Sequence, residues 1–241
     1  DLRRLDWRAY GRSDRFYVKE FEADTNLRCC FVVDTSGSMD FGSGDVTKLQ
    51  YAKRLVGALG YMATQQGDAV GLSCVAEGVV QSLPPKRGPS HLRTMFDLLE
   101  QAEPKGETEL VTVLHELAET IRQRALIIVL SDLFVEPALL KECFQHLRFR
   151  KHDVAVFHLL DDREINFDFD RPMRFVDMEG GAPVMADPSL IAEQYRKSLK
   201  TYLDSMKVVV RDAAVDYHRV SIQESYVEVL SRFLLGRSPR K

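Results

Sequence analysis

Three oxygen-bearing side chains alternate along one short stretch of the chain, directly after an apolar run. Asp34, Ser36 and Ser38 follow residues 27–33, whose apolar side chains and lack of turn-forming residues predict a buried strand. Ligands of parallel sheets bind at the carboxyl ends of the strands, so this stretch is placed for recognition or chemistry. Carboxylates and hydroxyls are the ligands that hard cations such as Mg²⁺ prefer. The stretch therefore outlines a cation site that other segments must complete.

Two further oxygen donors stand where neighbouring segments would reach the same place. Thr108 precedes a predicted helix, and Asp132 follows a predicted strand at residues 125–130. Because parallel strands end at one edge of a sheet, we expect both side chains to lie near Asp34. Mg²⁺ is the expected ion, with Mn²⁺ and Ca²⁺ as alternatives, because Mg²⁺ binds a few protein oxygens and keeps open positions. Residues expected to contact a partner beside the ion are Gly37, Met39, Asp40 and Glu109.

Apolar strand-like runs alternate with amphipathic helical patterns along the chain, and these elements must position the donors. Strands are predicted at residues 16–21, 27–33, 68–76, 79–83, 125–130, 153–160 and 218–222, with Pro84 and Pro85 ending the fourth. Helices are predicted at residues 48–66, 90–100, 108–122, 137–149, 189–214 and 225–235, and a small hairpin at 173–178 and 184–186. This alternation predicts an α/β fold with a doubly wound, mostly parallel central sheet and helices on both faces, a Rossmann-type three-layer sandwich.

Length and composition limit the domain organisation and the classes of partner. The 241 residues contain no internal repeat and no long linker, so we expect one domain over residues 1–241, made of an opening segment 1–26, a core 27–165 and a tail 166–241. The net charge of −3 gives no indication of nucleic-acid binding. No apolar run is long enough to cross a membrane. The four cysteines form no Cys-x-x-Cys pair, which favours a reduced, cytoplasmic protein.

Several plainer interpretations compete with the cation site. Asp34 and the serines are also common helix caps, so the stretch could simply begin a helix. The Asp-Thr-Ser-Gly order resembles an aspartic protease motif, but there is no second copy. Neither Gly-x-Ser-x-Gly nor a phosphate-binding Gly-x-x-x-x-Gly-Lys motif is present, and the six histidines lack zinc spacing. The acidic run at residues 161–170 is interpreted as a solvated loop, with a weak calcium site or an acidic contact surface as alternatives.

The donor pattern resembles the metal-ion-dependent adhesion site (MIDAS) of von Willebrand factor A domains. The Asp-x-Ser-x-Ser motif is matched by Asp34, Ser36 and Ser38, the family's distant threonine by Thr108, and its strand-end aspartate by Asp132. The resemblance implies that the hydroxyls touch the metal, that the two aspartates often act through water, and that a partner carboxylate fills the sixth position. It covers residues 27–165 as a fold.

The opening segment carries a narrower resemblance. Asp1, Arg3, Asp6, Trp7 and Arg12, followed by the Lys-Glu-Phe-Glu strand at residues 19–22, resemble the bacterial domain-of-unknown-function 58 family. This resemblance implies that the domain works with a MoxR-type AAA ATPase, so the partner would be intracellular. Packing of Trp7 on the sheet edge is the plainer interpretation of that residue, and a role as a partner anchor is the alternative.

These features together favour a binding module over an enzyme. We expect a non-enzymatic, metal-dependent protein-binding adaptor or cochaperone whose metal attracts a carboxylate of the partner. The alternative is a metal-dependent hydrolase such as a phosphatase, in which the ion activates water. That chemistry needs a general base near the metal, for which Asp40 and Glu109 are the candidates.

Overall fold

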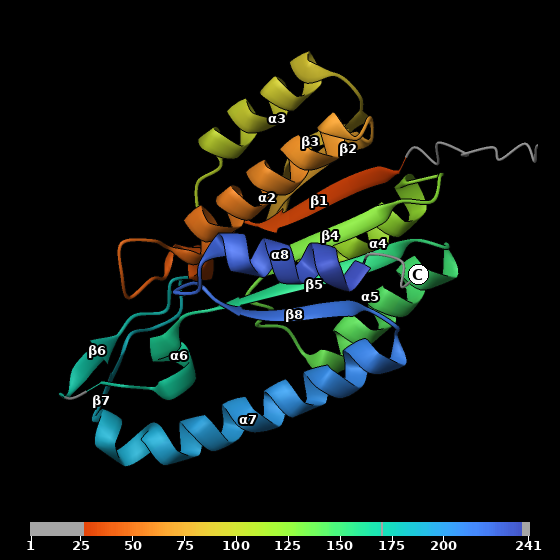
Figure 1. The fold of residues 1–241 in the computed structure, drawn as a ribbon. Coiled ribbons are helices and arrows are strands. Elements are labelled where there is room, and N and C mark those ends of the chain that lie inside the picture. The colour runs from red at the N-terminus through yellow and green to blue at the C-terminus, as the bar shows by residue number, and fades with distance from the viewer. Residues whose placement is uncertain (1–26, 170, 238–241) are drawn as a thin grey trace, which may run out of the picture.

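One six-stranded sheet forms the centre of the computed structural model, which describes residues 27–169 and 171–237 (Figure 1). The strands lie in the order β3-β2-β1-β4-β5-β8. Their bounds are β1 (Arg28–Asp34), β2 (Ala69–Ala76), β3 (Gly78–Lys86), β4 (Leu126–Ser131), β5 (Asp153–Leu160) and β8 (Asp216–Ser221). Only the pairing of β3 with β2 is antiparallel. The predicted doubly wound α/β fold is confirmed, while the strand expected at residues 16–21 and the Trp7 region lie outside the described residues.

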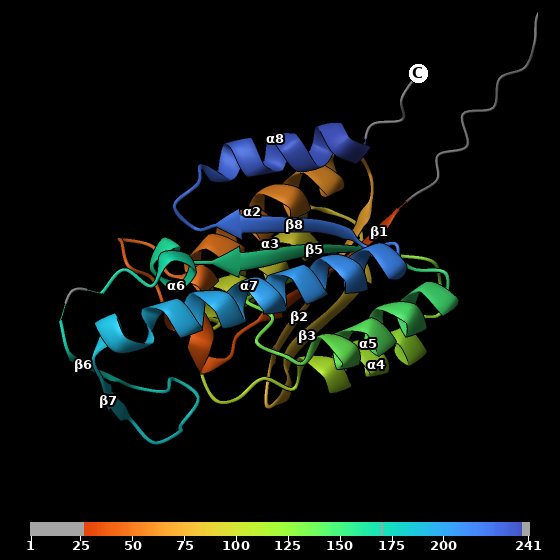
Figure 2. The same cartoon turned by 90° about the horizontal axis from the view of Figure 1, so that it is seen from below.

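Helices cover both faces of the sheet (Figures 1 and 2). One face carries α2 (Lys48–Gln65), α3 (Pro89–Gln101) and α8 (Tyr226–Arg237), and the other carries α4 (Leu110–Thr120), α5 (Pro137–Phe149) and α7 (Pro188–Asp212). Successive side chains of a strand point to opposite faces, so Phe31 and Val33 enter the first core and Cys30 and Val32 the second. No helix within residues 27–169 and 171–237 is long and apolar enough to cross a membrane.

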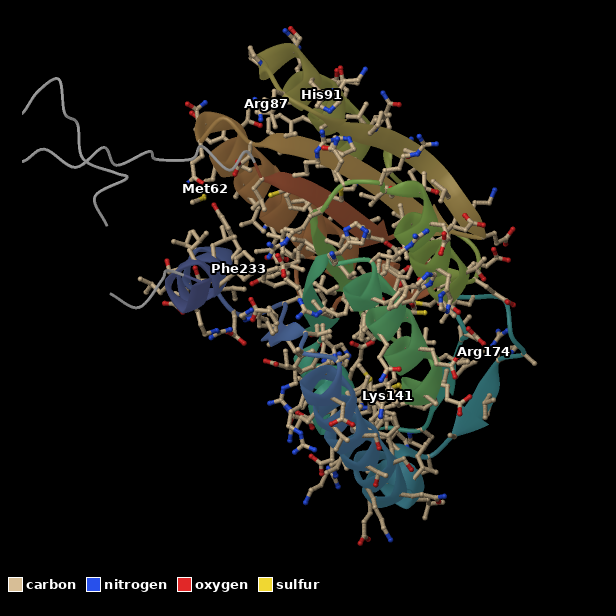
Figure 3. The ribbon with its side chains drawn as sticks, turned by 90° about the vertical axis from the view of Figure 1, so that its right-hand side faces the viewer. Met62, Arg87, His91, Lys141, Arg174 and Phe233 are labelled. Atoms are coloured by element: carbon tan, nitrogen blue, oxygen red, sulfur yellow. The ribbon has the colours of Figure 1, made fainter. Side chains whose placement is uncertain are left out.

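The last helix closes the first core. Phe233 on α8, labelled in Figure 3, packs against Phe157 of β5. The ring centroids are 5.1 Å apart in an edge-to-face arrangement. The same ring contacts His218 of β8 at 5.3 Å. Aromatic pairs in this geometry stabilise a core beyond the area that they bury. The contacts therefore fix α8 across the two strands at one side of the sheet.

Strand β1 lies at the point where the chain changes direction across the sheet. The chain leaves β1 through α2 to β2 on one side, and later returns to place β4 on the other side. In a doubly wound sheet the crevice for ligands opens at this switch point, outside the carboxyl ends of the strands. The end of β1 at Asp34 and the end of β4 at Ser131 therefore border the same crevice.

Two local predictions are wrong. Pro84 and Pro85 do not end the β3 strand, which continues to Lys86, because an edge strand tolerates the missing backbone donors of proline. The acidic run is not a plain solvated loop, because it folds into the short helix α6 (Asp162–Asn166). A capping box between Asp161 and Glu164 begins this helix.

The small predicted hairpin is present beyond the carboxyl edge of the sheet. It consists of β6 (Met173–Phe175) and β7 (Val184–Ala186), paired antiparallel, and it lies near α6 and the start of α7 (Figure 1). Aromatic contacts hold its base: Phe167 after α6 stacks on Phe175 of β6 at 5.8 Å and contacts Tyr195 of α7 at 4.4 Å. The hairpin is therefore anchored on the side of the sheet where the strands end.

Candidate metal-binding site

Asp34 ends β1, and its buried carboxylate collects hydrogen bonds from three segments. The hydroxyl of Ser131 donates to Oδ2 at 2.6 Å, the backbone N–H of Ser36 donates to Oδ1 at 3.0 Å, and the hydroxyl of Thr108 donates to Oδ2 at 3.4 Å. These donors come from the end of β4, the turn after β1 and the segment before α4. The sheet edge therefore brings Thr108 to Asp34, as the sequence predicts.

The two serines of the motif lie side by side. Their hydroxyl oxygens are 3.1 Å apart, with Ser36 buried and Ser38 half-buried. A 3₁₀ turn, η2 (Gly37–Asp40), follows Ser36, which is its N-cap residue. Backbone bonds tie this turn to the segment before α4, from Gly37 N–H to the carbonyl of Gly106 at 2.9 Å and from Lys105 N–H to the carbonyl of Thr35 at 2.8 Å. The turn and the threonine segment are thus one rigid unit.

The chemistry of these side chains suits a hard divalent cation. One carboxylate and three hydroxyls come together here: the hydroxyls of Ser36 and Ser38 lie 3.1 Å apart, and the hydroxyl of Thr108 donates to Asp34 at 3.4 Å. Mg²⁺ and Ca²⁺ take oxygen ligands of this kind. Among the described residues no group of three or more His, Cys, Asp or Glu side chains could hold a metal. A metal bound at this edge would therefore depend on the hydroxyls.

Burial makes the Asp34 carboxylate costly to ionise without a cation. Burial, and to a smaller extent the negative charge of Asp132, raise the pKa of Asp34 to about 6, against the opposing effect of the hydrogen bonds from Ser131 and Ser36. A divalent cation would stabilise the ionised form, because an adjacent opposite charge lowers the pKa of a carboxyl group. A cation at this edge would therefore offset part of the cost of ionising Asp34.

Asp132 reaches the same edge, but its carboxylate is occupied by a lysine. The Nζ of Lys48 lies 2.6 Å from Oδ2 of Asp132 and 2.7 Å from Oε1 of Glu164, and the lysine side chain is fully buried. This oxygen of Asp132 therefore already has a positively charged partner, and the expectation that Asp132 serves a metal stays a prediction. The ammonium also lies 5.1 Å from the centre of the Phe134 ring and 5.8 Å from that of Phe41.

The environment of Lys48 keeps its side chain charged. Burial alone would lower the pKa of the ammonium, but the charges of Asp132 and Glu164 and their hydrogen bonds outweigh this effect and raise it. Aromatic faces add a further attraction for a cation. Lys48 is thus a positive charge at the carboxyl edge of the sheet, where Asp34 and the two motif serines also lie.

The residues expected to contact a partner divide into buried and exposed ones. Met39 is fully buried in the first core and Gly37 is buried as well, so neither offers a side chain to a partner, and these two assignments are corrected. The motif places Met39 inward because the 3₁₀ turn rotates it onto the core. Asp40 and Glu109 are exposed and stay candidates.

A family profile described as "DUF58: Protein of unknown function DUF58" matches residues 1–205, which is most of the chain. The chain belongs to the DUF58 family. A DUF58 relative, the uncharacterized protein Rv1480 of Mycobacterium tuberculosis, is 22% identical over 242 residues, covering 98% of this chain and 75% of the relative.

Solved structures share the fold of this DUF58 chain at low sequence identity. The conserved hypothetical protein BatB from Bacteroides thetaiotaomicron aligns with a TM-score of 0.60 at 19% identity, covering 87% of this chain and 98% of BatB. The VWA domain of SpRpn10 aligns with a TM-score of 0.49 at 12% identity, covering 89% of this chain and 96% of that domain. The likeness to BatB agrees with the predicted α/β architecture.

Three polar residues at this edge of the sheet were missed in the sequence. Ser131 directly precedes Asp132 and bonds to Asp34, and the serine hydroxyl also accepts the N–H of Leu133 at 2.9 Å. Lys48 and Glu164 are recognisable only through their pairing across the fold. Glu164 had a local signal in the capping box of α6, and Ser131 had one in its place at the end of a predicted strand.

The burial of Asp161 also contradicts the prediction that the acidic run is a solvated loop. Its side chain belongs to a fully buried residue and Oδ2 accepts hydrogen bonds from the N–H and the hydroxyl of Ser43 at 2.8 and 2.9 Å and from Gln223 at 2.8 Å. These bonds lower the pKa of Asp161 although burial opposes them. Asp161 therefore fastens the loop after η2 to α6.

Proposed function

We propose that this DUF58 chain is a divalent-metal-dependent protein-binding module whose Mg²⁺ takes a carboxylate of the partner as a ligand. Asp34, Ser36, Ser38 and Thr108 hold the ion, and Asp132 acts from its pairing with Lys48 as a neighbouring charge. A metal with one open position gives a strong, directional contact that forms only when the metal and an acidic partner are both present.

The observation that carries this proposal is the convergence of the motif serines and Thr108 on Asp34. Side chains from residues 34, 36, 38 and 108 meet at the carboxyl edge of β1, although 74 residues separate the first from the last. Helix capping alone does not account for this convergence, because the cap of α2 is Thr47, whose side chain accepts the N–H of Gln50. The motif therefore has a role other than starting that helix.

The partner that we propose is a MoxR-type AAA ATPase, for which the chain would be an adaptor or cochaperone in the cytoplasm. The support for this partner is the resemblance of the opening segment and of the adhesion motif to a family thought to act with such ATPases. The cytoplasmic location is supported by the buried free thiols of Cys30, Cys74 and Cys143, since thiols of this kind are usual in a reducing compartment.

We also propose that the module is not an enzyme. The candidate general bases, Asp40 and Glu109, are exposed, and within the described residues no side-chain hydrogen bond orients either carboxylate. A general base is normally positioned by such a bond. A screen with phosphate and ester substrates tests this point, because turnover that Asp34→Asn abolishes would overturn it.

Calorimetry with MgCl₂ tests the metal. Asp34→Asn keeps the shape of the side chain and removes its charge, and Asp97→Asn on the exposed face of α3 is the matched control. We expect Mg²⁺ binding in the wild type and in the control, and none in Asp34→Asn. Pull-down of a MoxR-type ATPase in Mg²⁺, but not in excess chelator, is expected for the same two proteins. Equal binding of metal and ATPase by all three proteins would contradict the proposal.

A further inference from the structure

The loop of the β6–β7 hairpin lies directly on the adhesion motif. A methyl group added at Gly37 would collide with the carbonyl oxygen of Met178, and would lie 2.8 Å from the carbonyl carbon of Met178 and 3.5 Å from the backbone nitrogen of Glu179. Only glycine fits at the centre of the Asp-x-Ser-x-Ser motif because the backbone of the hairpin passes so close. The hairpin therefore covers the place where a partner would approach.

An open pocket of about 340 Å³ lies between the hairpin and the sheet edge. The sheet side contributes Ser38 and Glu164, and the hairpin contributes Asp177, Met178 and Glu179. One wall of this pocket is thus a serine of the metal motif, and the opposite wall carries two carboxylates from a different part of the chain. Figure 1 shows the hairpin reaching this edge from beyond α6.

Glu179 is the carboxylate whose surroundings are incomplete. Its Oε1 atom is buried and has no hydrogen-bond partner among the described residues. The backbone N–H of Glu179 donates to Oδ1 of Asp177 at 2.8 Å, which fixes the turn but leaves the side chain unsatisfied. A buried, unpaired carboxylate oxygen is unfavourable. Lys48, the buried cation at this edge of the sheet, is already held by Asp132 and Glu164.

A metal ion at the motif would supply the missing partner of Glu179. The backbone of Glu179 passes beside Gly37, between the two motif serines in sequence, and its side chain lines the same pocket as Ser38. A glutamate side chain that starts beside Gly37 is long enough to reach toward the neighbouring hydroxyl of Ser38 across this pocket. The aromatic contacts of Phe175 and Phe167 hold the base of the hairpin, so the loop is presented to the motif from a fixed support.

We propose that Glu179 is a ligand that the chain itself offers to the adhesion-site metal. It fills the position that the proposed function reserves for a carboxylate of the partner, and the inference rests on that function. The β6–β7 hairpin is then an autoinhibitory element, and a partner carboxylate must displace Glu179 in order to bind. Exchange of one carboxylate for another leaves the charge around the metal unchanged.

Mn²⁺ alone is the probe for this proposal, with calorimetry for affinity and water-proton relaxation for the number of water molecules on the bound ion. Glu179→Gln and Glu179→Ala remove the ligand, and Glu193→Gln on the exposed surface of α7 is the matched control. We expect both Glu179 variants to bind Mn²⁺ at least about tenfold more weakly and to carry one more water on the ion than the wild type. Glu193→Gln should match the wild type in both measurements.

The same experiment separates failure of this inference from failure of the proposed function. If the Glu179 variants match the wild type in affinity and in water number, Glu179 is not a ligand, while the metal site stands. If Asp34→Asn binds Mn²⁺ as tightly as the wild type does, the metal site itself is refuted, and the role of Glu179 with it. Circular dichroism of each variant checks that the fold is retained.

Discussion

The ammonium of Lys48 is 2.6 Å from a carboxylate oxygen of Asp132, and both side chains are buried. This pair places one fixed positive charge among the carboxylates at the edge of the sheet. The ammonium offsets part of the negative charge of Asp132 and Glu164. In the proposed function, the divalent ion would be a second, exchangeable cation beside Asp34 and the motif serines.

Replacement of Lys48 tests the structural role of the built-in charge. Lys48→Met keeps most of the apolar stem but leaves Asp132 and Glu164 without their partner, and breaking a buried pair in this way typically costs about 3–5 kcal/mol. We expect a loss of this size in the free energy of unfolding, measured by urea denaturation at pH 7. Lys207→Met, which removes an exposed pair with Asp204, should cost far less, because solvent screens exposed ion pairs. Equal losses in the two variants would contradict the assignment.

Removal of a single hydroxyl tests the metal ligands. Thr108→Val preserves the shape of the side chain, and its hydroxyl donates to Asp34 only at 3.4 Å, so the fold should change little. We expect the Mg²⁺ affinity measured by calorimetry to fall by about 10- to 100-fold. Thr94→Val on α3, whose hydroxyl donates to the carbonyl of Ser90, is the matched control and should leave the affinity unchanged. An unaltered affinity in Thr108→Val would remove Thr108 from the site.

Gly37 reports the contact between the motif and the hairpin. Gly37→Ala places a methyl group against the backbone of Met178, so the hairpin loop must move away. We expect amide hydrogens of residues 176–183 to exchange several-fold faster in this variant, because local opening becomes easier. Gly44→Ala, in the segment between η2 and α2, is the control, since nothing lies within 4 Å of the added carbon. Identical exchange in both variants would show that the hairpin does not rest on the motif.

The buried imidazole of His158 should make the stability depend on pH. Burial lowers its pKa to about 4, mainly because the charged form is desolvated, and its Nδ1 lies 2.7 Å from the hydroxyl of Tyr217. The unfolded state binds the proton more tightly, so this group's contribution is full above about pH 6.5 and is lost as the pH falls toward 4. The expected total is about 3 kcal/mol. Asp34, whose pKa is raised, acts in the opposite direction between pH 4 and 6.

A variant isolates the histidine from that opposing contribution. His158→Gln retains Asp34 and removes only the titrating ring. The difference in the free energy of unfolding between the wild type and His158→Gln should therefore shrink or reverse as the pH is lowered from 7 to 4. A difference that stays constant over this range, measured by urea denaturation at several pH values, would show that His158 does not titrate differently in the folded and unfolded states.

The order of elements could be predicted from the sequence because the local signals agree with one another. The apolar runs that become β1, β4 and β5 have the length and composition of buried strands. Each helix between them carries its own apolar face. The exception is β3, which was predicted to end before Pro84 and Pro85 but continues to Lys86. The sequence does not say which strand lies at an edge of the sheet, where proline is tolerated.

The candidate site was predictable where a donor follows a predicted strand or precedes a predicted helix. Asp34 and the serines are neighbours in sequence, and Thr108 and Asp132 were expected from their places at the same edge of the predicted sheet. Lys48 could not be found in this way, because its partners lie 84 and 116 residues away and an exposed lysine at a helix start looks the same in sequence. Glu179 was hidden for a similar reason, since its position depends on how the hairpin folds back.

The two prolines of β3 also determine how other chains can meet this sheet. Pro84 and Pro85 stand in the outermost strand, where consecutive backbone nitrogens without hydrogens cannot donate to a further strand. The open flank of the sheet is therefore a poor template for strand addition, which limits self-association through this side.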